Sequence, residues 1–241
     1  GLNNRRLREF GAEIEFYKGL PEFFDTIKHF VKANPVHRQH DIRVEHYIVS
    51  TGLRQMILGS KIAPYVDGVW GAEFVENPPQ PGYLDPAGAN APRSSKIISQ
   101  IAYALDNTTK TRAIFEINKG TNKISDIDVN AQIPDEDRRV PIQNMVYIAD
   151  GPSDIPVFSI VNRFGGRTFA VYQPGSAEEF SQVNRLQKQG RVQSYGEAEY
   201  TQGSQTAMWI ENAVSEIAEY IVTNRQRALG DKLGKPPKHL D

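Results

Sequence analysis

Asp150 and Asp154 are the residues of this sequence with the clearest chemical potential. They follow the apolar run at residues 145–149 (MVYIA) and stand four apart, across a turn that contains Gly and Pro. Both carboxylates can therefore converge on one hard cation, and oxygen ligands of this kind suit Mg²⁺. A structural alternative stays open, because an Asp-Gly-Pro-Ser-Asp turn can also cap a helix that starts at Ser153 or Asp154.

Two more polar clusters occur where a predicted element begins or ends. Ser50, Thr51 and Gly52 follow the apolar run at 47–49, and Lys110 opens a helical pattern. An ammonium group beside a helix N-terminus suits an anion. Taken singly, both signals are weak, since Ser, Thr and Gly end many strands and a lysine on a helix is usually solvated.

The elements that must position these residues alternate in a βαβ rhythm, which predicts an α/β fold with a mostly parallel sheet. In such a sheet, ligands bind beyond the carboxyl ends of the strands, so we expect the three polar clusters to meet at one edge. From the apolar periodicity we expect strands at 43–50, 66–74, 145–149 and 167–172, and helices at 20–31, 53–58, 95–105, 109–118, 153–161, 176–188 and 210–221.

The composition is that of a folded protein without a strong charge. The chain has 241 residues, of which 39% are hydrophobic, and 28 Lys and Arg against 29 Asp and Glu give a net charge of -1. This balance speaks against nucleic acid and anionic membranes as partners, and no run approaches the roughly 18 apolar residues of a membrane span. The absence of cysteine excludes disulfides and fits a reducing compartment, so we expect a cytoplasmic protein.

In order, type and spacing, these residues together resemble the phosphatase branch of the haloacid dehalogenase-like (HAD) superfamily and are similar to its phosphoserine-phosphatase-like members. The matching stretches are YIVSTGL around Ser50, TTKTRAIFEINKG around Lys110 and YIADGPSDIPVF around Asp150 and Asp154. The resemblance implies a Rossmann-like three-layer α/β/α core. It also implies that Ser50, Thr51, Gly52 and Lys110 bind the phosphoryl group of a small phosphorylated metabolite, and that Asp150 and Asp154 bind Mg²⁺.

The resemblance further implies a nucleophilic aspartate at the end of a central first strand, followed two residues later by a second acid. No stretch fits that motif. Asp126 and Asp128 have the spacing, but they follow a polar segment and lie between the matching stretches around Lys110 and Asp150, which is the wrong order for the family. We therefore expect the central strand to be missing from this chain, the natural protein to continue upstream, and the chain by itself to be inactive.

The resemblance divides the chain into three parts. Residues 1–16 are interpreted as the remnant of a helical cap or linker, 17–229 as the HAD-like catalytic core, and 230–241 as a flexible tail. The leading hypothesis is a Mg²⁺-dependent phosphohydrolase, which could form a homodimer. A non-catalytic phosphate- or protein-binding module is the alternative, and a carbon-halogen dehalogenase is disfavoured by the paired acids.

Overall fold

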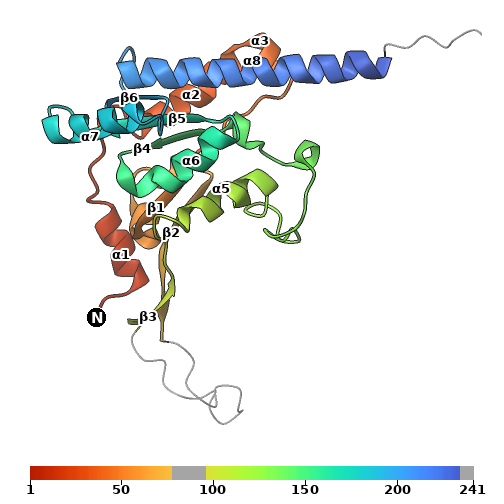
Figure 1. Ribbon diagram of the computed structural model, residues 1–241. Helices are drawn as coiled ribbons and strands as arrows, with labels where there is room; N and C mark the ends of the chain where they lie inside the picture. The colour runs from red at the N-terminus through yellow and green to blue at the C-terminus, as the bar shows by residue number, and fades with distance from the viewer. Residues whose placement is uncertain (78–95, 234–241) are drawn as a thin grey trace, which may run out of the picture.

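The computed structural model describes residues 1–77 and 96–233 and has an α/β fold, as predicted (Figure 1). The strands are β1 (Tyr47–Leu53), β2 (Gly68–Glu76), β3 (Ile98–Tyr103), β4 (Val146–Ala149), β5 (Arg167–Tyr172) and β6 (Ser194–Glu197). The α-helices are α1 (Asn4–Gly11), α2 (Glu22–Ala33), α3 (Pro35–Gln39), α4 (Arg54–Gly59), α5 (Lys110–Lys119), α6 (Ile155–Arg163), α7 (Ala177–Lys188) and α8 (Gln205–Leu233). Short 3-10 turns occur at η1 (Ala63–Tyr65), η3 (Asp135–Asp137), η4 (Ile142–Asn144) and η5 (Pro152–Asp154).

The strands form two separate three-stranded sheets, where the sequence predicts one. In the first sheet β1 pairs with β2 in parallel and β2 pairs with β3 in antiparallel orientation. In the second sheet β4, β5 and β6 are all parallel. Within the described residues, β1 and β4 each pair on one side only, so each presents an open edge.

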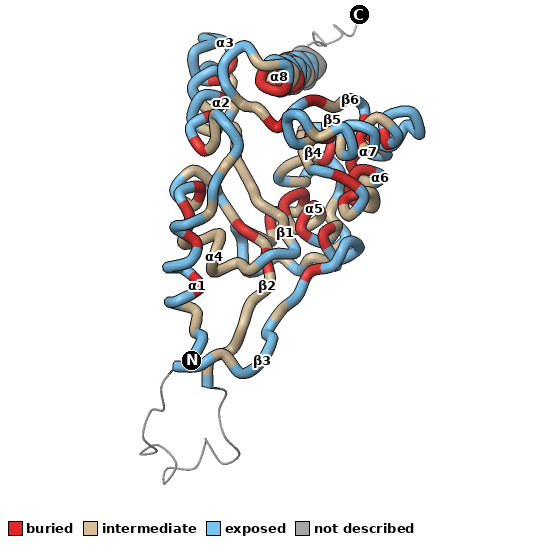
Figure 2. The backbone as a smooth tube through the Cα atoms, turned by 90° about the vertical axis from the view of Figure 1, so that its left-hand side faces the viewer, coloured by how far each residue is buried: buried red, intermediate tan, exposed pale blue. Residues whose placement is uncertain are grey.

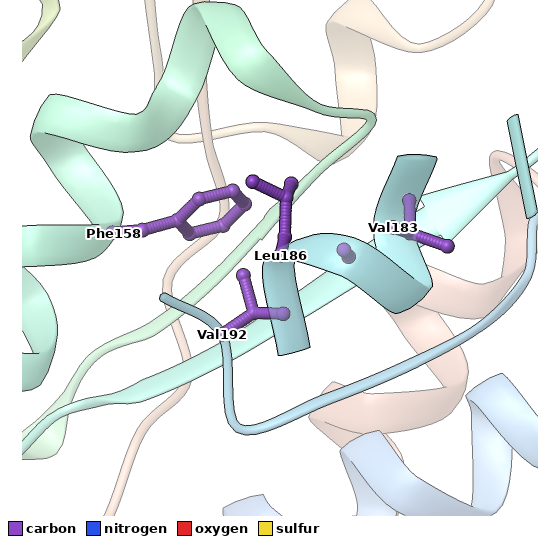
Figure 3. Close-up of a cluster of buried hydrophobic side chains, with 5 residues drawn as sticks. Phe158, Val183, Leu186 and Val192 are labelled. Atoms are coloured by element: carbon purple, nitrogen blue, oxygen red, sulfur yellow. The ribbon is translucent and has the colours of Figure 1, made fainter. Parts of the chain in front are cut away.

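Helices cover both faces of the second sheet. On one face, Ala170 of β5 packs in a cluster with Phe158 of α6 and with Val183 and Leu186 of α7. Val192 also belongs to this cluster (Figure 3). On the other face α2 and α8 meet around Ile148 of β4. Buried residues gather in α5, α6, α8 and β5, whereas β3 is exposed along most of its length (Figure 2).

The first sheet is supported by α4 and by the N-terminal helix α1. The two helices cross very closely, because an added Cβ at Gly11 would lie 2.0 Å from the Met56 carbonyl oxygen and one at Gly59 would lie 2.0 Å from that of Arg8. The stretch interpreted as a cap remnant or linker thus includes a helix that packs against α4.

The prediction of a helix at 95–105 is wrong, because Ile98–Tyr103 of this stretch form strand β3. The apolar residues of this stretch fit helical spacing, but pairing with β2 decides its conformation. The loop predicted at 77–92 lies outside the described residues from 78 onward. At the other end, α8 continues through residues 230–233, so the first part of the predicted tail is helical, and 234–241 lie outside the described residues. No helix in the described ranges is long and apolar enough to cross a membrane.

Candidate functional site

A buried ion pair joins two of the predicted site residues. The Lys110 ammonium donates to Oδ1 of Asp154 at 2.8 Å, and the two side chains are only 7% and 3% exposed. Lys110 is the first residue of α5, whereas Asp154 stands between β4 and α6, 44 residues further along the chain. The packing of α5 against α6 brings them together.

Two further side chains hold the Asp154 carboxylate. The Tyr147 hydroxyl donates to Oδ1 at 2.5 Å, and the Ser153 hydroxyl donates to Oδ2 at 2.7 Å. Burial raises the pKa of Tyr147, and the Asp154 charge and the hydrogen bond raise it further, so this hydroxyl keeps its proton. Tyr147 could not be recognised as a site residue from the sequence, because an aromatic residue in a strand is most often part of a core.

The capping alternative for Asp154 is not what the structure has. Asp154 occupies the position before α6, yet its side chain makes no hydrogen bond to the helix N-terminus. Its carboxylate is turned instead toward Lys110, Tyr147 and Ser153.

Asp150 lies at the end of β4 in a different environment from Asp154. It is exposed, and its carboxylate makes no hydrogen bond or ion pair to any described residue. The charges of Glu179 and Asp150 act on the Tyr17 hydroxyl, whose pKa is raised first by burial and then by these two carboxylates. A free carboxylate therefore stands at the carboxyl edge of the second sheet, with the phenol of Tyr17 nearby.

Ser50, Thr51 and Gly52 lie within β1, because the strand runs to Leu53, beyond the end predicted at residue 50. The Ser50 hydroxyl accepts a hydrogen bond from the Gly52 amide at 3.0 Å, in the part of β1 where the register with β2 shifts between Val49 and Leu53. Ser50 and Thr51 line a large cavity, whereas Gly52 does not.

That cavity, of about 1470 Å³, separates the two sheets. Its walls include β1 from Tyr47 to Thr51 and β4 from Val146 to Ala149, and apolar side chains of α2 and α8, among them Ile27, Ile210 and Ile217, also line it. Lys110, Asp150 and Asp154 line the same cavity as Ser50. Five of the six predicted site residues therefore line one cavity, and among Ser50, Lys110, Asp150 and Asp154 a direct hydrogen bond is present only between Lys110 and Asp154.

The comparisons with known proteins identify one relative. The chain is 39% identical over 215 residues to an uncharacterized protein of Borreliella burgdorferi, and the alignment covers 87% of this chain and 70% of that protein. The chain belongs to the family of this Borreliella protein. No protein-family model matches the chain, and no solved structure matches it.

The two acids at the end of β4 suit a divalent cation to different degrees. Asp150 offers a carboxylate without partners beside the cavity, and such oxygen ligands suit Mg²⁺. The lone pairs of Asp154 are largely used by its three hydrogen bonds. Within the described residues, no group of three or more His, Asp or Glu side chains could hold a metal ion. Of the two acids, Asp150 would therefore be the one to bind a cation here, and it would need further ligands besides Asp154.

Proposed function

We propose that the protein is a Mg²⁺-dependent phosphohydrolase of the HAD type that acts on a small phosphorylated substrate. The observation that carries the proposal is the buried Lys110–Asp154 ion pair at a cavity that Ser50 and Asp150 also line. A lysine, a hydroxyl and a free carboxylate around one cavity are the groups that phosphoryl transfer needs, since it depends mainly on positioning and on charge stabilisation.

The open edges of β1 and β4 support the proposal that a strand is missing between them. The cavity is lined by β4 along its whole length and by β1 from Tyr47 to Thr51, and it is apolar where α2 and α8 face it. A parallel strand inserted there would join the two sheets into one and give a three-layer α/β/α core. Without it, each buried backbone N–H or C=O group left unpaired costs about 1–3 kcal/mol.

The missing strand would carry the nucleophile. An aspartate at its carboxyl end would lie between Ser50 and Asp150, attack phosphorus in line and form an aspartyl phosphate, while the leaving oxygen takes a proton from a second acid. Water then hydrolyses the acyl phosphate. The alignment with the Borreliella protein covers 70% of that relative, which leaves room there for such a segment.

The residues of this chain would bind and orient the substrate. The Ser50 hydroxyl and the Lys110 ammonium bind phosphoryl oxygens, and Asp150 ligates Mg²⁺, with Asp154 holding Lys110 in place. The cation, when bound, neutralises charge on the phosphoryl oxygens.

Turnover of p-nitrophenyl phosphate tests the proposal. A protein that includes the upstream strand should hydrolyse it with Mg²⁺ and not with excess chelator, whereas residues 1–241 alone should be inactive. Asp150→Asn should abolish turnover, and Asp126→Asn, on a surface turn, should leave it unchanged. If the native protein is shown by intact mass to start at Gly1, the missing strand is refuted; Mg²⁺-independent phosphate binding without turnover would favour the binding module.

A further inference from the structure

We propose that Tyr147 is a positioning residue of this site: its hydroxyl orients the Asp154 carboxylate, and Asp154 in turn holds the Lys110 ammonium toward the cavity. The effect on catalysis rests on the proposed phosphohydrolase function. The contacts from which we infer the positioning role do not depend on that function.

The hydrogen bonds of Asp154 leave its carboxylate little freedom. Oδ1 accepts from Lys110 at 2.8 Å and from Tyr147 at 2.5 Å, and a carboxylate oxygen offers about two lone pairs, so this oxygen is fully used. Oδ2 accepts from Ser153 at 2.7 Å. A rotation of the carboxylate would break all three bonds, so Asp154 gives the Lys110 ammonium a defined position.

The Tyr147 ring is itself fixed by the core. It packs edge-on against Phe158 of α6, with ring centroids 5.5 Å apart and planes at 80°, and Phe158 is fully buried. The backbone of Tyr147 is paired with Thr168 of β5 in the sheet register. The hydroxyl cannot leave Asp154 unless this part of the core repacks, so the positioning contact is built into the sheet.

Lys110 keeps one donor for a ligand. Its ammonium has three N–H groups, of which one is directed to Asp154 and another to the Ser153 hydroxyl at 3.4 Å. The third has no partner among the described residues, and Lys110 lines the cavity. An ammonium held in this way can meet a phosphoryl oxygen without reorganisation, which is the condition for effective charge stabilisation.

Tyr147→Phe is the variant that tests the proposal, because it removes the hydroxyl and keeps the ring against Phe158. Tyr195→Phe is the matched control, since it removes a strand hydroxyl that bonds Asn184 at 3.4 Å instead of a site residue. In a protein that includes the upstream strand, Tyr147→Phe should lower kcat about 10- to 100-fold with little change in KM. Tyr195→Phe should change neither constant.

A spectroscopic measurement on residues 1–241 separates this proposal from the proposed function. In ¹H–¹⁵N spectra of lysine side chains, the buried Lys110 ammonium should give a slowly exchanging signal, assigned by its loss in Lys110→Arg. Tyr147→Phe should broaden or remove that signal, and Tyr195→Phe should not. An unchanged Lys110 signal in Tyr147→Phe would overturn the proposal whatever the activity. A lost signal supports it even where no protein form hydrolyses p-nitrophenyl phosphate, an outcome that refutes only the phosphohydrolase.

Discussion

The Lys110 ammonium and the Asp154 carboxylate lie 2.8 Å apart in a buried site, although 44 residues separate them in the chain. Removal of one partner from such a pair leaves a buried charge without compensation, which costs about 3–5 kcal/mol. Lys110→Met and Asp154→Asn should therefore each lower the free energy of unfolding strongly, as urea denaturation would measure. The exposed pair Arg5–Glu9, with side chains 85% and 61% exposed, is the control, and Arg5→Met should have almost no effect. Equal effects of Arg5→Met and Lys110→Met would contradict the burial argument.

Hydrogen exchange should distinguish the open strands from the paired ones. In residues 1–241, β5 is paired on both sides, whereas β1 and β4 are paired on one side only. Amides of β1 and β4 that point into the cavity should therefore exchange faster than those of β5. In a protein that includes the proposed upstream strand, the same amides should become protected. Equal protection of β1 and β4 in both proteins would show that no strand enters between them.

His46 makes the stability of the fold depend on pH. Burial lowers the pKa of His46 to about 4, against 6.5 for an unperturbed histidine, while the hydrogen bond to the Phe24 carbonyl opposes the shift in part. The unfolded chain therefore binds this proton more tightly than the folded chain does. Above about pH 6.5 His46 is neutral in both states and does not change the free energy of unfolding with pH. Stability is lost as pH falls from there to about 4, by up to roughly 3 kcal/mol. His46→Gln, which cannot take up this proton, is the comparison.

The measurement for His46 is the free energy of unfolding at several pH values between 4 and 7. Carboxylates also titrate in this window, so the informative quantity is the difference between the wild-type protein and His46→Gln. That difference should change with pH in the predicted direction. A constant difference would mean that His46 titrates alike in the folded and unfolded chain.

The close crossing of α1 and α4 predicts that Gly11 cannot be replaced. In an exposed helix interior, Gly→Ala would stabilise by about 0.5–1 kcal/mol, but the new Cβ would lie 2.0 Å from the Met56 carbonyl oxygen. The helices must separate, and we expect Gly11→Ala to destabilise the protein by about 1–3 kcal/mol. Gly68→Ala is a milder control, since its nearest contact is a Tyr47 ring carbon at 3.1 Å. Thermal melts of the two variants would show the difference, and a stabilised Gly11→Ala would exclude the close crossing.

The sequence was sufficient where local pattern and buried environment agree. The run at 145–149 is apolar on both faces and the run at 167–172 is mostly apolar, and they form β4 and β5. By contrast, β6 (SYGE) has no apolar run at all, and β3 has helical spacing; both are strands because a neighbouring strand pairs with them. Pairing with a partner distant in sequence leaves no local signal, so these two elements could not be read from the pattern.

The same division holds for the candidate site. The sequence by itself determined which residues stand at strand ends and helix starts, and from this Ser50, Lys110, Asp150 and Asp154 could be expected at one edge. Only the tertiary structure decided that the two acids differ: Asp150 is free at the cavity, whereas Asp154 is bound by Lys110 and by the Tyr147 hydroxyl. The reason is physical, because spacing along a chain limits which groups can meet, but the burial and hydrogen bonds that set the state of a carboxylate come from elements packed around it.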